Sequence, residues 1–238
     1  MDYDTQLTIL ADTLDDLEEA RKALDNRIRS AKELKGGALV AGLEGLAVEL
    51  HASEHAVVLN LQRTLRKHPL YDWVKRNKGL GEKTVARFLG LLGNPLQYET
   101  KDGEVIARTV GSLWHYCGYA PGHDKRVKGG GKITYNPAAR TRMFLIAEAC
   151  MKNKTSPFRV HYDEARAATA DKVHDKPCQI CAGKTPKGVK PADHAAAVIG
   201  KPWKDGHKHM HAIRMVAKHI LRDLWIEADE KREELLAA

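Results

Sequence analysis

The sequence predicts a mainly α-helical protein, and three observations carry that prediction. Apolar residues recur at helical spacing throughout the first 68 residues, shorter periodic segments punctuated by glycine follow, and the segment after about residue 205 has one apolar face. The chain has 238 residues, of which 43% are hydrophobic and 29% charged, so a packed core is expected. Strand signals are weak, and the best are short segments at residues 104–106 and 132–135.

Residues 1–68 are expected to form a coiled-coil arm, a long antiparallel helical hairpin. A narrow apolar seam in steps of three and four residues runs through residues 4–35, and Gly36 and Gly37 then break the helix. A second seam of matched length follows and ends before Pro69. The arm serves either to dimerise or dock a partner protein, or to brace the globular part. The sequence leaves these alternatives open, a homodimer through the coiled coil among them.

The remainder of the chain divides into two further regions. Residues 69–168 are expected to form a small helical domain, and residues 169–238 an irregular segment followed by a long C-terminal helix. The helices expected after the arm span residues 70–78, 82–92, 109–118, 137–152, 158–168 and 205–236.

The composition also bears on the compartment. The longest apolar stretch, residues 36–50, is interrupted by Glu44 and Glu49, so the chain lacks the run of about 18 uncharged residues that spans a bilayer. The N-terminus is acidic rather than basic, and four cysteines are too few for a disulfide scaffold. We therefore expect no membrane contact and a cytoplasmic location.

Positive charge is concentrated in the middle of the chain. The formal net charge is +8, but residues 1–68 carry 9 Lys and Arg against 12 Asp and Glu, and residues 227–238 carry 2 against 5. The intervening residues therefore hold a net charge of +14. A cationic segment between acidic ends is typical of a domain that binds a polyanion such as double-stranded DNA, although a lysine-rich soluble surface gives the same count.

The sharpest motif is a pair of glycines around one apolar residue, between two expected helices. Gly79, Leu80 and Gly81 permit a tight turn in which the leucine plugs the core while backbone amides at the start of the next helix face outward. Amides so arranged bind phosphate, as in a helix-hairpin-helix element that grips the DNA backbone. The simpler interpretation is a helix that ends at a capping glycine. The residues assigned to DNA contact here are Lys78, Gly79, Leu80, Gly81, Lys83, Thr84 and Arg87.

A second basic cluster surrounds a run of three glycines. Glycine lets the backbone approach a phosphate strand closely, and an aromatic residue such as Tyr135 can stack on a splayed base. A flexible, solvated loop is the alternative interpretation. The cations assigned to DNA contact in this cluster are Lys125, Arg126, Lys128, Lys132, Arg140 and Arg142.

A Cys-x2-Cys pair and several histidines predict a metal site in the irregular segment. Cys178 and Cys181 offer two thiolates on one turn, and His207 and His211 lie four residues apart, on the same side of a helix start. These four ligands would close a tetrahedral zinc site. Such a site would organise the irregular segment and attach it to the last helix.

Other interpretations of this segment stay open. The spacing between the cysteine pair and the later histidines is long for a zinc finger, so His174 or His194 is an alternative for either histidine. A redox dithiol or unligated cysteines would also fit the pair. Cys117 and Cys150, by contrast, have the surroundings of small buried hydrophobic residues.

The order of these features points to a family. The arm is followed by residues 79–86 (GLGEKTVA), then by residues 113–121 (LWHYCGYAP), and then by Asn136 and Arg140 ahead of a helix. This order resembles the C-terminal part of the RNA-guided DEDD-type insertion-sequence transposases, over roughly residues 5–168 and the final helix. The resemblance implies a coiled coil for assembly and a small helical domain that binds DNA and a bridge RNA.

Two departures from this family bear on catalysis. The arm stands where the family has an RNase H-like domain with four metal-binding acids. The nucleophilic serine of the family is absent from residues 122–135, where the resemblance would place it, and Ser112 and Ser156 lie outside that interval. The resemblance therefore implies a DNA-handling scaffold without the catalytic groups.

Taken together, these features predict a non-catalytic DNA-binding accessory protein of phage or mobile-element recombination. One alternative is a regulator whose arm docks onto a partner recombinase, as directionality factors do with a phage integrase. Another is a nuclease, either transposase-derived or similar to the His-Asn-His nucleases, to which the cysteine pair followed by Asp193 and His194 gives a poor match. RNA is a further partner that the resemblance allows.

Overall fold

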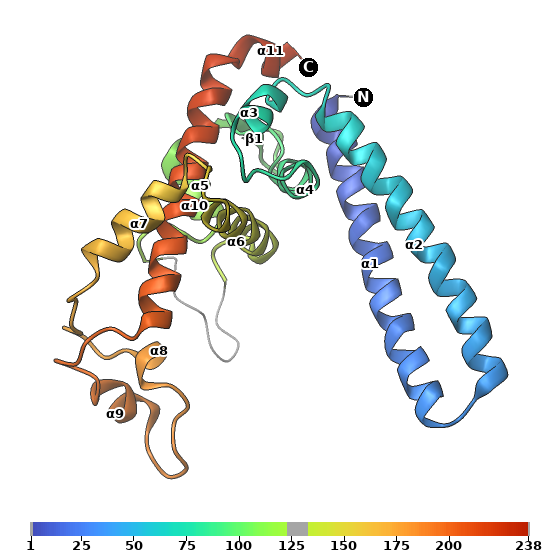
Figure 1. Ribbon diagram of the computed structural model, residues 1–238. Coiled ribbons are helices and arrows are strands. Elements are labelled where there is room, and N and C mark those ends of the chain that lie inside the picture. The colour runs from blue at the N-terminus through green and yellow to red at the C-terminus, as the bar shows by residue number, and fades with distance from the viewer. Residues whose placement is uncertain (1, 123–132, 238) are drawn as a thin grey trace.

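The computed structural model describes residues 2–122 and 133–237, and its architecture is mainly α-helical, as the sequence predicts (Figure 1). Two antiparallel strands, β1 (Gln97–Glu99) and β2 (Val105–Ala107), form a small hairpin. The helices within these ranges are α1 (Tyr3–Glu33), α2 (Gly37–Leu65), α3 (Tyr71–Arg76), α4 (Glu82–Leu92), α5 (Val110–Tyr116), α6 (Pro137–Lys152), α7 (Arg159–Ala168), α8 (Gln179–Ala182), α9 (Pro191–Ala196), α10 (Asp205–Glu230) and α11 (Arg232–Ala237).

Of the two short strands expected, one is present. The segment 104–106 largely coincides with β2. Residues 133–135 are irregular instead, and Lys132 lies outside the described residues. Just beyond this segment the backbone N–H of Asn136 donates to Tyr116 O at 2.8 Å, and the Asn136 side chain caps α6, so the chain enters a helix at once.

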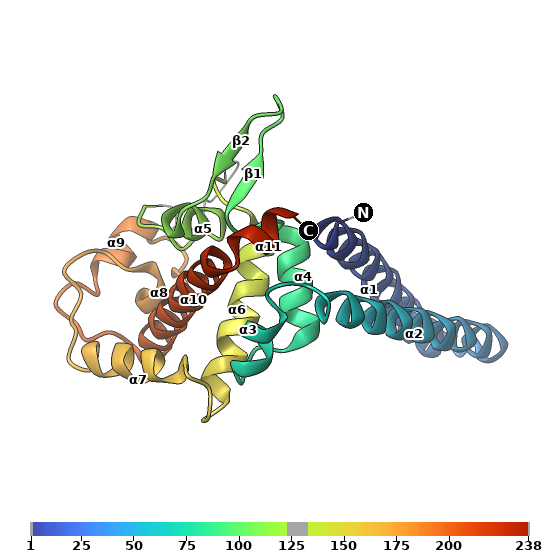
Figure 2. The ribbon, with the colours of Figure 1, turned by 90° about the horizontal axis from the view of Figure 1, so that it is seen from above.

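The two N-terminal helices form the antiparallel hairpin that the heptad seams predict (Figures 1 and 2). Two ion pairs connect them. Arg21 Nε lies 2.7 Å from Glu54 Oε1, and Lys32 Nζ lies 2.9 Å from Glu44 Oε1 near the tip. The chain reverses at Lys35, which takes a positive φ of 56°.

The root of the arm packs against α4 and shares its core with the rest of the protein. Leu7, Ala11 and Leu14 of α1 are buried in one cluster with Phe88 of α4. The contact is close because Gly90 has no side chain. A Cβ atom at Gly90 would lie 2.5 Å from the backbone oxygen of Leu7. The arm is therefore a structural brace at its root.

The outer half of the arm projects away from the globular part (Figure 2). Leu24, Ile28 and Ala31 of α1 are buried within the hairpin itself, whereas residues 37–60 of α2 include no buried residue. The sequence offered a brace and a docking arm as alternatives. The structure places a brace at the root and a projecting, partly apolar surface toward the tip.

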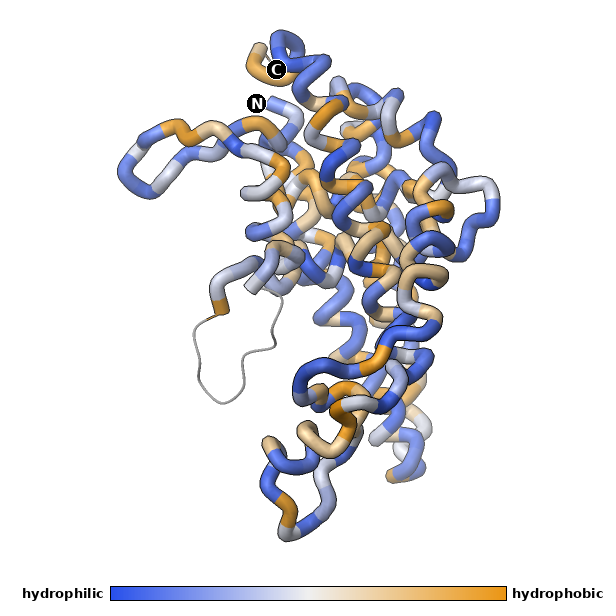
Figure 3. Tube along the Cα trace, turned by 90° about the vertical axis from the view of Figure 1, so that its left-hand side faces the viewer, coloured by the Kyte–Doolittle hydropathy of each residue, from blue (hydrophilic) through white to orange (hydrophobic). Residues whose placement is uncertain are grey.

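Helix α10 runs through the globular part and is held there by tryptophans. Trp73 Nε1 on α3 donates to Asp223 Oδ2 at 2.7 Å, and Trp114 Nε1 on α5 donates to the backbone oxygen of Lys218 at 3.1 Å. The buried indole of Trp73 and the partly buried indole of Trp114 thus each gain a hydrogen-bond acceptor on α10. Hydrophobic and hydrophilic residues are interspersed along the helices (Figure 3), and within the described ranges none is long and apolar enough to cross a membrane.

The close contact at Gly90 gives a stability prediction. We expect Gly90→Ala to lower the free energy of unfolding by about 1–3 kcal/mol, because the new methyl group meets the backbone of α1. Urea denaturation followed by circular dichroism measures the change. The control is Gly42→Ala on α2, where nothing lies within 4 Å of the added Cβ and helix propensity should raise stability by about 0.5–1 kcal/mol. Equal effects of the two substitutions would contradict the packing described here.

Candidate metal centre and glycine turn

Four side chains with metal-ligating atoms meet where the irregular segment reaches α10. One ligand atom from each of His174, Cys178, Cys181 and His207 lies within 4.8 Å of those of the other three. His207 Nδ1 is 3.3 Å from Cys181 Sγ and 3.6 Å from Cys178 Sγ. Two thiols and two imidazoles at this separation are close enough to bind one metal ion.

Backbone pairing brings the first of these ligands into the group. Val173 forms an isolated antiparallel bridge with Pro202, and the N–H of His174 donates to Lys201 O at 3.0 Å. The indole of Trp203 then stacks on the His207 ring with their centroids 4.0 Å apart. This backbone pairing places His174 beside the start of α10.

The surroundings of the four side chains favour metal ligation. Burial raises the pKa of the Cys181 thiol, and the neighbouring Cys178 raises it further, so a cation would be needed to favour the Cys181 thiolate. Burial lowers the pKa of His207, and nearby His174 lowers it further, which favours the neutral imidazole that a metal needs. His174 Nε2 is buried and has no hydrogen-bond partner among the described atoms. A metal ion would satisfy that nitrogen.

The histidine that the sequence favoured for the fourth position lies elsewhere. His211 meets the edge of the Trp203 indole at 5.6 Å between centroids and is not part of the group. His174, the alternative, takes its place. The other alternative, His194, donates from Nε2 to Ala182 O at 3.1 Å. His194 and Asp193, the residues of the His-Asn-His-like hypothesis, both belong to the short helix α9 and lie outside the group.

The glycine pair forms a tight turn between α3 and α4. Gly79 has a φ of +103°, Leu80 is only 7% exposed and belongs to the core, and Gly81 is exposed at the N-terminus of α4. A Cβ at Gly79 would lie 2.9 Å from Cys150 Cα, so the turn rests on the end of α6. The tight turn and the buried leucine are as the sequence predicts. Thr84 is half-buried in the first turn of α4.

Three of the cations assigned to DNA contact are ion-paired to the arm instead. Lys83 Nζ lies 3.1 Å from Glu18 Oε1, Arg87 pairs with Glu18 at 2.8 Å and with Asp15, and Arg142 also pairs with Asp15. Burial would raise the pKa of Glu18, but the hydrogen bonds from Arg87 and Lys83 outweigh it and lower that pKa to about 2. These cations are therefore largely neutralised by α1.

The remaining assigned cations differ in their surroundings. Lys78 is exposed, and no ion pair within the described ranges involves it. Arg140 is held in place, because its Nη1 donates to Gly118 O at 3.0 Å and its guanidinium lies over the rings of Tyr119 and Tyr135. The other four members of the second cluster lie outside the described residues, namely Lys125, Arg126, Lys128 and Lys132.

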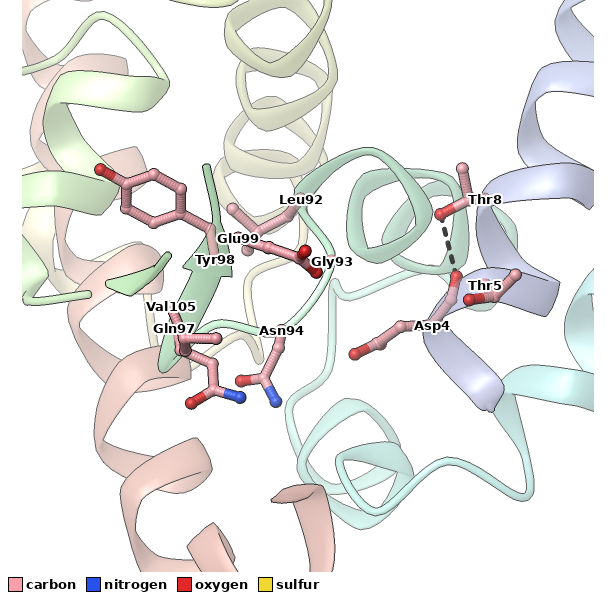
Figure 4. Close-up of a pocket in the computed structure, with 10 residues that line it drawn as sticks. All are labelled: Asp4, Thr5, Thr8, Leu92, Gly93, Asn94, Gln97, Tyr98, Glu99 and Val105. Atoms are coloured by element: carbon pink, nitrogen blue, oxygen red, sulfur yellow. Dashed lines mark hydrogen bonds between the residues drawn. The ribbon is translucent and has the colours of Figure 1, made fainter. Parts of the chain in front are cut away.

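A cleft between the start of α1 and the small hairpin is unsuited to phosphate. Its volume is about 410 Å³, and Figure 4 shows Asp4, Thr5 and Thr8 on one side of it and residues 97–99 on the other. The carboxylates of Asp4 and Glu99 line it, and none of its lining residues is a lysine or arginine. An anion would be repelled there.

Comparison of the chain with protein-family models, with curated proteins and with solved structures gave no match. The resemblance to the transposases stays a prediction from the sequence. Among the residues of the candidate centre, sequence reasoning missed Trp203, whose stacking on His207 positions that ligand. The signal was an aromatic residue two positions before the start of α10, inside a segment otherwise rich in Lys, Pro and Gly.

Proposed function

We propose that this protein binds the DNA backbone through the turn between α3 and α4, as a non-catalytic accessory protein of phage or mobile-element recombination. One observation carries the proposal. Gly79 adopts a left-handed conformation and Leu80 is buried, so that Gly81 and the N-terminus of α4 stay at the surface. A helix N-terminus preceded by exposed glycine offers backbone N–H groups and a partial positive charge to a phosphate.

The cations around the turn support a backbone contact of modest strength. Lys75 and Lys78 are exposed beside it, and Lys154 is exposed in the loop that follows α6, on which the turn rests. The ion pairs of Lys83 and Arg87 with α1 reduce what those two residues add. We therefore expect main-chain amides and a few lysines to do the binding, with little dependence on base sequence.

The metal that best fits the candidate centre is zinc, in a structural role. Two sulfur and two nitrogen ligands are the donor set of closed tetrahedral zinc sites. Three of these side chains are held by their surroundings, since His174 belongs to the bridged segment, His207 is stacked on Trp203, and Cys181 accepts from the backbone N–H of Lys204 at 3.4 Å. The ion would fix the segment between α7 and α10 against the helix that it precedes.

A second candidate function, self-association, is favoured by the surface of α2 that faces away from α1. We define the outer stripe of α2 as six exposed residues in steps of three, four and seven. They are Ala38, Ala41, Gly45, Val48, Ala52 and Leu59. Leu43, Leu50 and Val57 lie on the opposite side of the helix, toward α1. Small residues at this spacing allow a second helix to approach closely.

The charges of α2 indicate a second copy, packed antiparallel, as the occupant of this stripe. Residues 37–54 carry three glutamates and no lysine or arginine, whereas residues 63–67 carry three cations and no acid. An antiparallel copy would bring the acidic half of one helix beside the basic end of the other. Glu49 and Arg63, which form no ion pair within the described chain, would then gain opposite charges.

We first predict the DNA-binding behaviour. Lys78→Ala should weaken binding to all duplexes alike and reduce the slope of log affinity against log salt by about one, whereas Lys83→Ala should have less effect because Glu18 already pairs with Lys83. Fluorescence anisotropy across a salt series measures both. Lys22→Ala, exposed on the arm, is the control. An affinity that does not depend on salt would falsify the proposed function.

The zinc assignment predicts one zinc ion per chain of the purified protein, lost in Cys181→Ser and in His174→Ala. Elemental analysis measures the ratio, and a chelator should lower the temperature of thermal unfolding of the wild type. His211→Ala and His194→Ala are matched controls that should keep the ion, because neither histidine belongs to the group. Retention in His174→Ala combined with loss in His211→Ala would reverse the ligand assignment.

The outer stripe predicts a dimer that a single charge disrupts. Val48→Glu places a charged side chain within the apolar stripe, where the second copy would remove it from water, and should give a monomer in sedimentation equilibrium with unchanged helix content. Asn60→Glu, on α2 but outside the stripe, should remain dimeric. A monomeric wild type would exclude self-association, and loss of a cognate integrase from Val48→Glu pull-downs would then support the docking of a recombinase instead.

A further inference from the structure

A second pocket, separate from the glycine turn and the metal centre, lies between the small hairpin, α5 and the start of α6. Its volume is about 590 Å³. Its lining includes Tyr98, Arg108, Ser112, Tyr116, Tyr135 and Asn136. A space of this size accommodates a small organic ligand such as a nucleotide.

Arg108 brings an uncompensated positive charge to this pocket. Its guanidinium lies 5.2 Å from the ring centroid of Tyr98 and 5.3 Å from that of Tyr116. Within residues 2–122 and 133–237, its buried Nη1 atom has no hydrogen-bond partner and no carboxylate forms an ion pair with it. Burial lowers the pKa of Arg108, whereas Arg87 has carboxylate partners that raise its own. A half-buried cation without a counter-ion is costly unless a ligand supplies the anion.

The backbone of Arg108 is fixed by the core. Its N–H donates to Leu96 O at 2.6 Å, and its carbonyl oxygen accepts from Trp225 Nε1 at 2.9 Å. Arg108 lies in the short connection between β2 and α5, and these two hydrogen bonds fix its backbone on both sides. Such positioning lowers the entropy that a ligand must lose on binding.

Other polar groups of the pocket already have partners within the fold. The hydroxyl of Tyr116 donates to Leu91 O at 2.8 Å and accepts from Asn136 Nδ2 at 2.9 Å, while Ser112 Oγ donates to Thr109 O at 2.7 Å. Arg108 Nη1 differs from these groups, because it is buried and no described atom accepts its hydrogen bond. The pocket therefore offers a ligand one guanidinium beside aromatic rings.

We propose that this pocket takes one unpaired nucleotide of a DNA strand, with its phosphate on Arg108 and its base against the rings of Tyr98 and Tyr135. Arginine suits phosphate because its N–H groups match the oxygen geometry, and tyrosine faces stack bases of any sequence. Tyr98 is 40% exposed on the hairpin, which projects from the globular part (Figure 2), so its ring is accessible to a strand. The inference rests on the proposed DNA-binding function and adds a preference for unpaired ends.

Fluorescence anisotropy with the full-length protein tests the preference directly. A blunt duplex and the same duplex with a short single-stranded DNA tail are compared for the wild type, Arg108→Gln and Tyr98→Leu. We expect the wild type to bind the tailed duplex at least about fivefold more tightly, the difference to vanish in Arg108→Gln and to shrink in Tyr98→Leu, and the blunt-duplex affinity to stay unchanged. Arg159→Gln, which removes an arginine that lies over the ring of Tyr162 but pairs with Asp163, is the matched control.

Several outcomes would overturn the assignment. These are equal affinity of the wild type for blunt and tailed DNA, a tail preference that survives in both pocket variants, and a stronger preference for an RNA tail. Tyr98→Leu changes a residue on the exposed hairpin, so the test stands even where Arg108→Gln does not fold.

Calorimetry with thymidine monophosphate and with inorganic phosphate separates this inference from the proposed function. If the protein binds duplex DNA but shows no tail preference and does not bind thymidylate, the proposed function stands and the nucleotide pocket is rejected. If the wild type binds thymidylate, Arg108→Gln does not, and neither binds duplex DNA, the nucleotide pocket is supported and the glycine turn is rejected as a DNA contact. Binding of inorganic phosphate as tightly as thymidylate would contradict the role given to the tyrosine rings.

Discussion

The contact between α1 and α4 is the constraint on which the rest of the molecule depends. It combines a backbone approach at Gly90, which only glycine permits, with ion pairs from Asp15 and Glu18 to Arg87 and its neighbours. The approach fixes the direction in which the arm leaves the globular part. The ion pairs decide which cations remain for a ligand. Since both sides of this contact are half-buried, the charges are less screened than on an open surface, and removal of one partner would leave the other uncompensated.

The sequence was sufficient for features that depend on local spacing. Heptad periodicity predicted the hairpin, and two glycines around a leucine predicted a turn with Leu80 inside, because both patterns act over a few residues. It was insufficient for Lys83 and Arg87, which were assigned to DNA contact because they follow the glycine turn in a segment of net positive charge. A segment total treats each charge as free, whereas tertiary contact with Glu18 neutralises these two. The fold places their partners far away in sequence, which no local pattern reveals.

The metal centre likewise depends on contacts between residues far apart in the sequence, which local spacing could not predict. The spacing of His207 and His211 correctly puts them on one side of α10, but only His207 reaches the sulfurs. The ring of Trp203 stacks on His207 and turns its edge to His211, and the pairing of Val173 with Pro202 supplies His174 instead. Helical spacing reports which side chains share a face. It does not report what else the folded chain brings to that face.

Some half-buried arginines form ion pairs with carboxylates and others do not, and this difference distinguishes arginines with a structural role from a candidate for ligand binding. Arg87 and Arg142 share the carboxylate of Asp15 and are explained by the docking of the arm. Arg108 is also half-buried, yet within the described chain it lies over two tyrosine rings and forms no ion pair, while its backbone is hydrogen-bonded on both sides. Aromatic faces compensate a cation only partly. The fold places acids beside two half-buried arginines and leaves a third without an ion pair among the described residues, and a bound anion at that third position is what we propose to supply the counter-charge.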